Sequence, residues 1–122
     1  MREILFRGKD KFDGEWYAGS LSHDTKYGNC FIEVSVHQGI TKEVIPETVG
    51  QFTGLTDKNG KRIFEGDIVN VENALVRGIF AVEYCGISAC FIVSHGERRY
   101  FLGGCNCKII GNIHDNPELL KE

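Results

Sequence analysis

The sequence predicts a mainly β protein, built from small barrel-like or sandwich antiparallel sheets with a short C-terminal helix. Fifteen glycines divide the 122 residues into short runs rich in Val, Ile, Phe and Tyr. Many strands joined by turns give this pattern. Only two prolines occur, and no long stretch has the period of an amphipathic helix. At this length we expect a single domain over residues 1–122.

The first strands are predicted from apolar residues that alternate with polar or aromatic ones. Ile32, Val34 and Val36 show this alternation, and Ile4 and Phe6 have the same spacing near the start. It gives a strand one aliphatic face and one mixed face. Polar segments at residues 10–14 and 23–29 are expected to be exposed loops.

A hairpin or tight loop is predicted around Asn59-Gly60. This dipeptide tolerates positive φ at both central positions of a tight turn, and apolar residues flank it on both sides. After it, Glu65-Gly66-Asp67 turns the chain into a strand at residues 68–71. We expect the Asp67 carboxylate to accept hydrogen bonds from backbone amides at the entrance of that strand.

Two later runs, at residues 79–82 and 91–93, are apolar on both faces and are predicted to be central strands. Residues 108–114 are predicted to form the last strand. Gly111 interrupts this strand, which indicates a bulge or a close backbone approach.

The C-terminal helix is predicted from three residues. Asn116 is a suitable N-cap, Pro117 fits the first helical position, and Glu118 complements the helix dipole. Because so few residues follow, the helix is expected to be about one turn long.

Charge and hydropathy limit the possible partners. The 17 Asp and Glu outnumber the 14 Lys and Arg, so the net charge is −3. A non-specific nucleic-acid binder usually has the opposite balance. No apolar run approaches the ~20 residues of a membrane span, and the start becomes charged too early for a signal peptide. We therefore expect a cytoplasmic protein without a membrane partner.

The five cysteines do not predict disulfides, because their number is odd and no secretory signal precedes them. Four cluster late in the chain: Cys85, Cys90, Cys105 and Cys107. Their C-x4-C and C-x-C spacings fit a zinc knuckle poorly, and small buried cysteines are the simpler interpretation. No metal ligand is predicted, although metal binding by these four stays open.

No catalytic arrangement is recognisable. The chain has no P-loop, no G-x-G-x-x-G motif and no complete G-x-S-x-G elbow. Its four histidines are scattered. We therefore expect neither an enzyme nor a bound cofactor.

Three segments carry a family resemblance: MREILFRGKD at 1–10, QFTGLTDKNGKRIFEGDIV at 51–69, and IIGNIHDNPELL at 109–120. In them the chain resembles the YopX family, small proteins encoded by bacteriophages and prophages. The resemblance implies a predominantly β fold with barrel-like sheets. It implies no assigned activity and no catalytic residues. Residues 66–69, followed by 78–82, are also similar to part of a small SH3-like barrel, an analogy of fold only.

The expected function is that of a phage or prophage accessory protein, a non-enzymatic one that binds a phage or host protein or a second copy of itself. The predicted recognition element is the exposed hairpin, with the residues Asp57, Lys58, Asn59, Lys61 and Arg62. The alternative is a small nucleic-acid-binding barrel. Its stacking platforms would come from the aromatic residues Trp16, Tyr17, Phe52, Tyr84, Tyr100 and Phe101.

Overall fold

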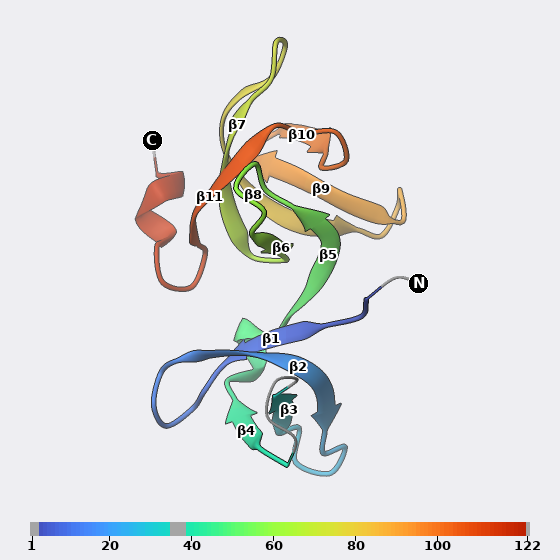
Figure 1. Cartoon of the computed structure of the whole chain (residues 1–122), viewed down its shortest axis with the longest axis vertical. Coiled ribbons are helices and arrows are strands. Elements are labelled where there is room, and N and C mark those ends of the chain that lie inside the picture. Colours follow the sequence, from blue (N-terminus) through green and yellow to red (C-terminus); the bar gives the residue numbers. More distant parts are fainter. Residues whose placement is uncertain (1–2, 35–38, 122) are drawn as a thin grey trace. The chain divides into compact units, whose positions relative to one another are not determined.

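The computed structural model confirms a mainly β chain with two antiparallel sheets (Figure 1). It describes residues 3–34 and 39–121, so Val36 of the predicted run lies outside the described part. The chain divides into two compact units, Met1–Phe52 and Thr53–Glu122, and the expectation of a single domain over residues 1–122 stays a prediction. No helix in the described ranges is long and apolar enough to cross a bilayer.

The first unit is an antiparallel meander. Its elements are β1 (Phe6–Lys9), β2 (Trp16–His23), β3 (Cys30–Val34), β4 (Thr41–Val44), the 3-10 turn η1 (Pro46–Thr48) and the start of β5 (Gly50–Thr56). β1 pairs with β2, β2 with β3 and β3 with β4, and β5 returns to pair with β1. The predicted strand near the N-terminus therefore begins at Phe6, two residues later than expected.

The core of the first unit depends on a close approach between β1 and β4. A Cβ added to Gly8 would lie 2.7 Å from Cγ2 of Val44, so only glycine fits there. Val44 and Ile32 are almost completely buried. Thr48 holds η1 against β1, because its hydroxyl accepts a bond from the Lys9 N–H at 2.9 Å and donates to the Ile45 oxygen at 2.6 Å.

The second unit contains the end of β5 and the six strands that follow it. They are β6 (Arg62–Phe64), β7 (Asp67–Glu72), β8 (Arg77–Cys85), β9 (Cys90–His95), β10 (Arg98–Phe101) and β11 (Cys107–Asn112), followed by the 3-10 turn η2 (Pro117–Leu120). Five of them form a sheet in the order β10-β9-β8-β7-β11. Since this order has two end strands, the sheet does not close into a barrel within the described residues.

The core of the second unit lies on one face of this sheet. Its side chains come from β6, β7, β8, β9 and β11 and from the loop that follows β10. They are Ile63, Val69, Val71, Phe80, Val82, Val93, Leu102 and Cys107. The sequence prediction that residues 79–82 and 91–93 form central strands is confirmed, because β8 and β9 are interior in the sheet order. Such double-sided apolar runs need cover on both faces.

Two local predictions in this unit are also confirmed. Asp67 is buried at the start of β7, and its carboxylate accepts a bond from the Phe64 N–H at 2.8 Å. The pairing of β11 with β7 shifts register between Ile109 and Gly111, which is a bulge. Gly111 also makes the expected close approach, because a Cβ there would lie 2.6 Å from Oδ1 of Asn116.

The predicted C-terminal helix is wrong in type: residues 117–120 form a 3-10 turn instead. Asn116 does not cap it with its side chain. Its Oδ1 accepts instead from the N–H of Asn112, at 3.3 Å. With only four residues in the turn, an α-helical nucleus has too few hydrogen bonds to offset its entropy cost.

Candidate functional site

The predicted recognition hairpin is partly buried. Lys58, Asn59, Lys61 and Arg62 are exposed, as expected, whereas Asp57 is only 7% exposed. The Asp57 carboxylate accepts hydrogen bonds from the backbone N–H groups of Asn59 and Lys61, both at 2.9 Å. Burial alone would raise the pKa of this carboxyl, but the amide donors and the nearby Lys61 charge outweigh burial and lower it.

The same hairpin covers the outer edge of β11. The second carboxylate oxygen of Asp57 accepts from the Ile109 N–H at 3.0 Å, and the Lys58 N–H donates to the Cys107 oxygen at 2.9 Å. These bonds satisfy backbone groups that would otherwise form a free sheet edge. The structure therefore gives Asp57 a role within the fold, and a binding role of its four exposed neighbours remains a prediction.

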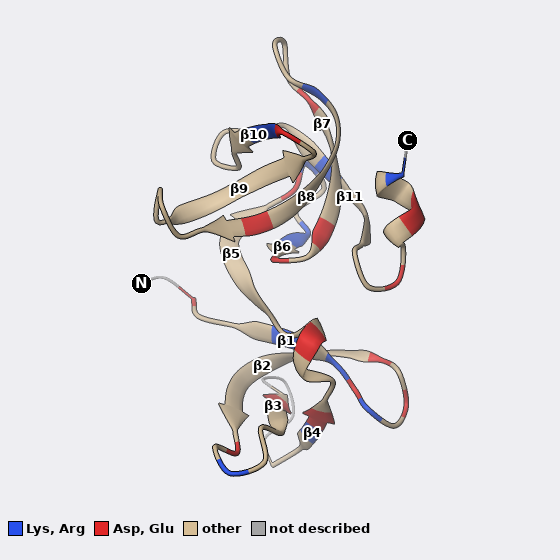
Figure 2. Ribbon diagram, turned by 180° about the vertical axis from the view of Figure 1, so that it is seen from behind, with Lys and Arg blue, Asp and Glu red and all other residues tan. Residues whose placement is uncertain are grey.

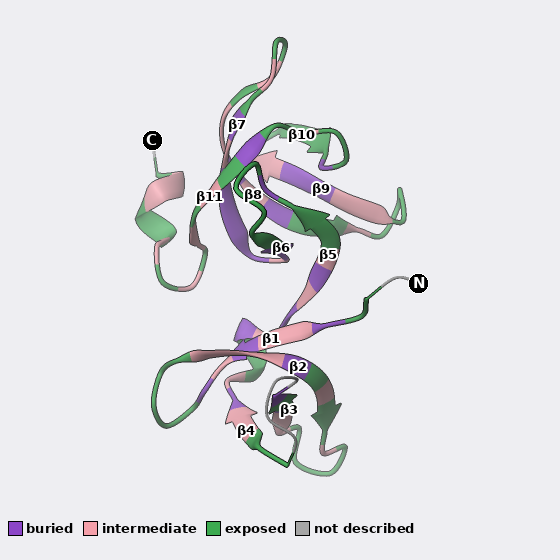
Figure 3. Ribbon diagram, in the orientation of Figure 1, coloured by how far each residue is buried: buried purple, intermediate pink, exposed green. Residues whose placement is uncertain are grey.

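β10 forms the opposite edge of the same sheet, and its outer side is open. Directly after the strand, the Leu102 N–H donates to the Phe91 oxygen at 3.2 Å. Because alternate residues of an antiparallel strand bond to the same neighbour, the backbone groups of Arg98 and Tyr100 also bond to β9. The backbone groups of Arg99 and Phe101 then point outward. No hydrogen bond joins the Arg99 backbone or the Phe101 N–H to any residue that the structure describes. All of β10 is exposed (Figure 3).

A hollow of about 340 Å³ lies beside this open edge. The residues that line it come from β8, β9, β10 and the β8–β9 turn: Cys85, Ser88, Ile92, Arg99, Tyr100 and Phe101. Phe101 pairs with Ile92 across the sheet, so both side chains stand on the same face. Phe101 is 67% exposed, and Ile87 on the neighbouring turn is 99% exposed. The site thus offers apolar surface beside an unpaired strand.

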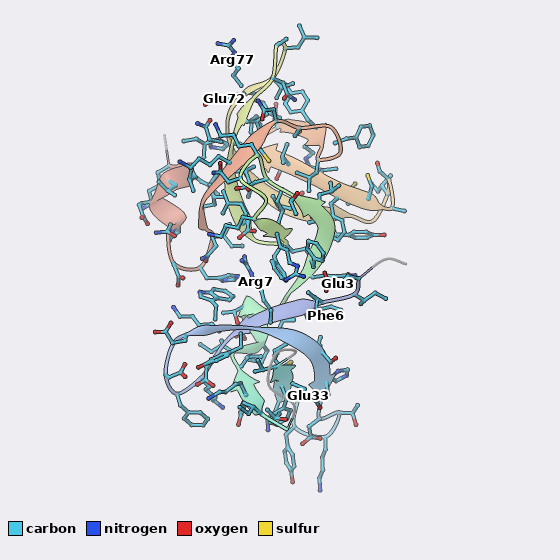
Figure 4. The ribbon with its side chains drawn as sticks, viewed as in Figure 1. Glu3, Phe6, Arg7, Glu33, Glu72 and Arg77 are labelled. Atoms are coloured by element: carbon cyan, nitrogen blue, oxygen red, sulfur yellow. The ribbon has the colours of Figure 1, made fainter. Side chains whose placement is uncertain are left out.

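Adjacent arginines on β10 have different roles. The Arg98 guanidinium lies 4.8 Å from the centre of the Phe80 ring and donates to the Arg77 oxygen at 3.0 Å. Figure 4 shows the Arg77 side chain itself extending outward from its strand. Arg99 lines the hollow instead and makes no ion pair or hydrogen bond with the part of the chain described here. Figure 2 shows basic residues, in blue, on β10. Arg99 is therefore available to an external anion.

The hollow also contains a thiol with unusual surroundings. The groups that favour the thiolate of Cys85 are the backbone N–H and hydroxyl of Ser88, the backbone N–H of Ile87 and the positive charge of Arg99. Together they lower the pKa of the Cys85 thiol. Burial instead raises the pKa of Cys105, and it raises that of Cys107 to about 11.

The metal question left open by the four late cysteines receives no support from the geometry. Cys85 and Cys90 face each other across the β8–β9 hairpin. Cys107 is buried in the core, and the Cys105 thiol donates to the Phe101 oxygen at 3.1 Å. Within residues 3–34 and 39–121, no group of His, Cys, Asp or Glu is arranged to hold a metal ion.

The predicted aromatic platforms divide into packed and exposed residues. Phe52 is buried, Trp16 stacks under the Arg7 guanidinium at 4.8 Å, and the Tyr17 hydroxyl donates to Asp13 at 2.7 Å. That bond raises the pKa of Tyr17 to about 12. Tyr84 and Phe101 keep large exposed areas, and both belong to the strands around the hollow.

A second hollow, of about 520 Å³, lies in the first unit between the β1–β2 loop and β3–β4. Its charged groups already have partners within the chain. Lys11 and Glu43 form an ion pair at 3.1 Å, the Asp10 carboxylate accepts from two amides of its own turn, and Lys42 lies over the Tyr17 ring. The hollow beside β10 is the stronger candidate, because Arg99 has no such partner.

Sequence reasoning missed Arg99 and the β10 edge. A usable signal exists: Gly96 follows an apolar strand, and Gly103-Gly104 ends the next short run. Gly96 has a φ of +63°, as a tight hairpin turn requires. These glycines mark where β10 begins and ends in the sequence. That β10 lies at the edge of the sheet is known only from the strand order.

The comparisons with known proteins agree with this fold. A crystal structure of protein EF1440 from Enterococcus faecalis is similar over 99% of this chain and 100% of that chain, with a TM-score of 0.61 and 26% identity. No curated protein matches the chain. The family model described as YopX protein matches residues 5–121. This match covers nearly the whole chain, and the protein therefore belongs to the YopX family.

Proposed function

We propose that this chain is a non-enzymatic binding protein that takes an extended segment of a partner protein onto the outer edge of β10. The observation that carries the proposal is the open backbone edge of β10 beside a hollow with an unpaired arginine. Extended peptides commonly add to such sheet edges, with main-chain bonds for affinity and side-chain pockets for specificity.

The chemistry of the edge defines the partner segment. The outward N–H and C=O of Arg99 and the N–H of Phe101 would pair with the added strand. Arg99 would bind a carboxylate, and the apolar wall of Ile92 and Phe101 would receive a side chain on the same face, two residues away. The partner segment therefore carries an acidic and an apolar residue at alternating positions.

A second copy of β10 is a poorer occupant than such a segment. An antiparallel β10 pair would bring the arginines at positions 98 and 99 of both copies close to one another. Like charges across neighbouring strands destabilise a pairing. The charge of the edge therefore favours a different, acidic partner over self-association.

The biological setting belongs to the same proposal. YopX-like proteins are encoded by phages and prophages, and this supports an accessory protein that acts in the cytoplasm of a bacterial host. Its partner is then a phage or host protein with the acidic and apolar segment described above.

An array of immobilised decapeptides with randomised sequences tests the proposal. We expect the protein, kept with its cysteines as free thiols, to select peptides with Asp or Glu two positions from a large apolar residue. Arg99→Glu should shift the selection toward Lys or Arg, because it reverses the charge that the segment meets. Lys108→Glu, a charge reversal of an exposed residue on β11, should leave the selection unchanged. An identical peptide profile for wild type and Arg99→Glu would contradict the proposal.

The nucleic-acid alternative has one supporting observation: the exposed Phe101 and Arg99 lie two residues apart on β10 and line the same hollow. It predicts that a labelled single-stranded oligonucleotide binds at low ionic strength and dissociates steeply as salt approaches the physiological level. Failure to bind at low salt removes this alternative.

A further inference from the structure

The β8–β9 hairpin carries one cysteine at each end of its turn. Cys85 is the last residue of β8, Cys90 is the first of β9, and the two are direct partners in the ladder. Both side chains therefore stand on the same face of the sheet. Both are partly exposed, and both thiols are free in this structure.

The spacing of this pair suits a disulfide. Because alternate residues of β9 bond to β10, the backbone of Cys90 bonds to β8, which makes Cys85 and Cys90 a hydrogen-bonded pair. Such partners have Cα atoms about 5.5 Å apart, inside the range of about 4.4–6.8 Å that disulfides span. Their Cβ atoms are usually about 5 Å apart, slightly more than a relaxed disulfide has. Closure is therefore possible with a small local movement, and the bond would be reduced easily.

The turn between the cysteines activates one of them. Ser88, through its N–H and hydroxyl, lowers the pKa of the Cys85 thiol most, and the Ile87 N–H and the positive charge of Arg99 lower it further. Ala89 completes this turn with a φ of +52°, an unfavourable conformation for a residue other than glycine. Because Cys85 also lines the hollow, a small oxidant reaches its sulfur.

We propose that Cys85 and Cys90 form a peroxide-reactive dithiol that closes into a disulfide across the β8–β9 hairpin. The Cys85 thiolate attacks one oxygen of hydrogen peroxide; an S–O bond forms, the O–O bond breaks, and the departing hydroxide takes a proton to become water. The Cys90 sulfur then attacks the sulfenic acid of Cys85, an S–S bond forms, and the S–O bond breaks. The hydroxyl leaves as water with the Cys90 proton. Overall, two thiols and one peroxide give one disulfide and two waters.

Cys105 and Cys107 provide the control within the same molecule. They are also close in sequence, but burial raises the pKa of both thiols. Cys107 is 1% exposed, and Cys105 donates its thiol proton to the Phe101 oxygen. Thiolate character and access decide which cysteine reacts, so the two pairs should behave differently.

The oxidation also has a consequence for binding, which rests on the proposed function. Cys85 forms part of the wall of the hollow, so closure of the disulfide replaces a thiol next to Arg99 with a bond to Cys90. We expect the oxidised protein to select peptides on the array less strongly than the reduced protein. The disulfide itself is measured without any peptide, so the two proposals fail separately.

The test exposes the reduced, folded wild-type protein to one equivalent of hydrogen peroxide, followed by alkylation and peptide mass spectrometry. We expect a single disulfide between Cys85 and Cys90, and full alkylation of Cys105 and Cys107. In Cys90→Ser, dimedone should label the Cys85 sulfenic acid about tenfold faster than it labels Cys105. Cys107→Ser should leave the Cys85–Cys90 disulfide unchanged. A disulfide that involves Cys105 or Cys107, no disulfide at all, or equal labelling of Cys85 and Cys105 would overturn the proposal.

Discussion

The two edge strands of the five-stranded sheet, β11 and β10, differ in whether their outward backbone groups are hydrogen-bonded. At β11, the Asp57 hairpin binds the outward Ile109 N–H and Cys107 carbonyl. At β10, the backbone of Arg99 has no partner among the described residues, and the adjacent hollow is lined by apolar and cationic side chains. Proteins usually protect their sheet edges. The proposed binding site therefore lies at the edge that is left open beside a hollow, in a sheet whose other edge is covered.

The largest effect is expected at the covered edge. Asp57→Ala removes a buried carboxylate that accepts from three backbone amides, those of Asn59, Lys61 and Ile109. We expect a loss of about 3 kcal/mol in the free energy of unfolding, because these donors are left unsatisfied. Urea denaturation followed by far-UV circular dichroism measures the loss. Lys58→Ala, an exposed change in the same hairpin, should stay within about 0.5 kcal/mol of wild type; equal effects of the two substitutions would contradict the assignment.

A second effect tests the bulge that ends the covered edge. Gly111→Ala places a Cβ 2.6 Å from Oδ1 of Asn116 and 3.0 Å from Cδ1 of Leu119. We expect a loss of about 2 kcal/mol, since overpacking forces the C-terminal turn to move. Gly103→Ala is the matched control, because its Cβ would meet no atom within 4 Å. If both variants unfold at the same urea concentration, the close approach at Gly111 does not exist.

Acid should weaken the covered edge by protonating Asp57. The pKa of this carboxyl is lower in the folded protein than its ordinary value of 3.8. The unfolded state then binds the proton more readily, so the stabilisation is complete above that value. It is lost as the pH falls below 3.8 through the folded pKa. Urea midpoints measured down this pH range should fall more steeply for wild type than for Asp57→Asn. Parallel pH profiles would refute the role of the charge.

At the open edge, a substitution should change binding and leave stability unaltered. Phe101 is 67% exposed, so Phe101→Ser should change the free energy of unfolding by no more than about 0.5 kcal/mol. The same variant should lose peptide selection on the array, because the apolar wall of the hollow is gone. A large loss of stability would mean that β10 is a structural edge like β11.

Local rules predicted much of this fold from the sequence. The Asn59-Gly60 turn, the Asp67 strand entrance and the Gly111 bulge each depend on neighbouring residues, and each is present. The prediction of a C-terminal helix was wrong for a local reason as well. The Asn116 side-chain oxygen accepts a hydrogen bond from the preceding Asn112 N–H and does not cap the turn that follows.

The site was less accessible to sequence reasoning, because it depends on contacts between distant residues. The Asp57 carboxylate was expected to be exposed, yet its partner Ile109 lies 52 residues away. Arg99 was not singled out from the sequence. Its backbone groups are unpaired because β10 is the end strand of its sheet, and this position is known only from the strand order. The sequence pattern indicates that a strand exists, whereas the order of strands decides which backbone groups stay unpaired.

Amide hydrogen exchange followed by NMR tests the difference between the two edges most directly. The account predicts that the N–H groups of Lys58 and Ile109 exchange slowly, because both donate hydrogen bonds at the covered edge. The N–H groups of Arg99 and Phe101 should exchange at rates near those of an unprotected chain, and should slow when a selected peptide is added. Slow exchange of Arg99 and Phe101 in the free protein, equal to that of Ile109, would contradict the open edge on which the proposed function depends.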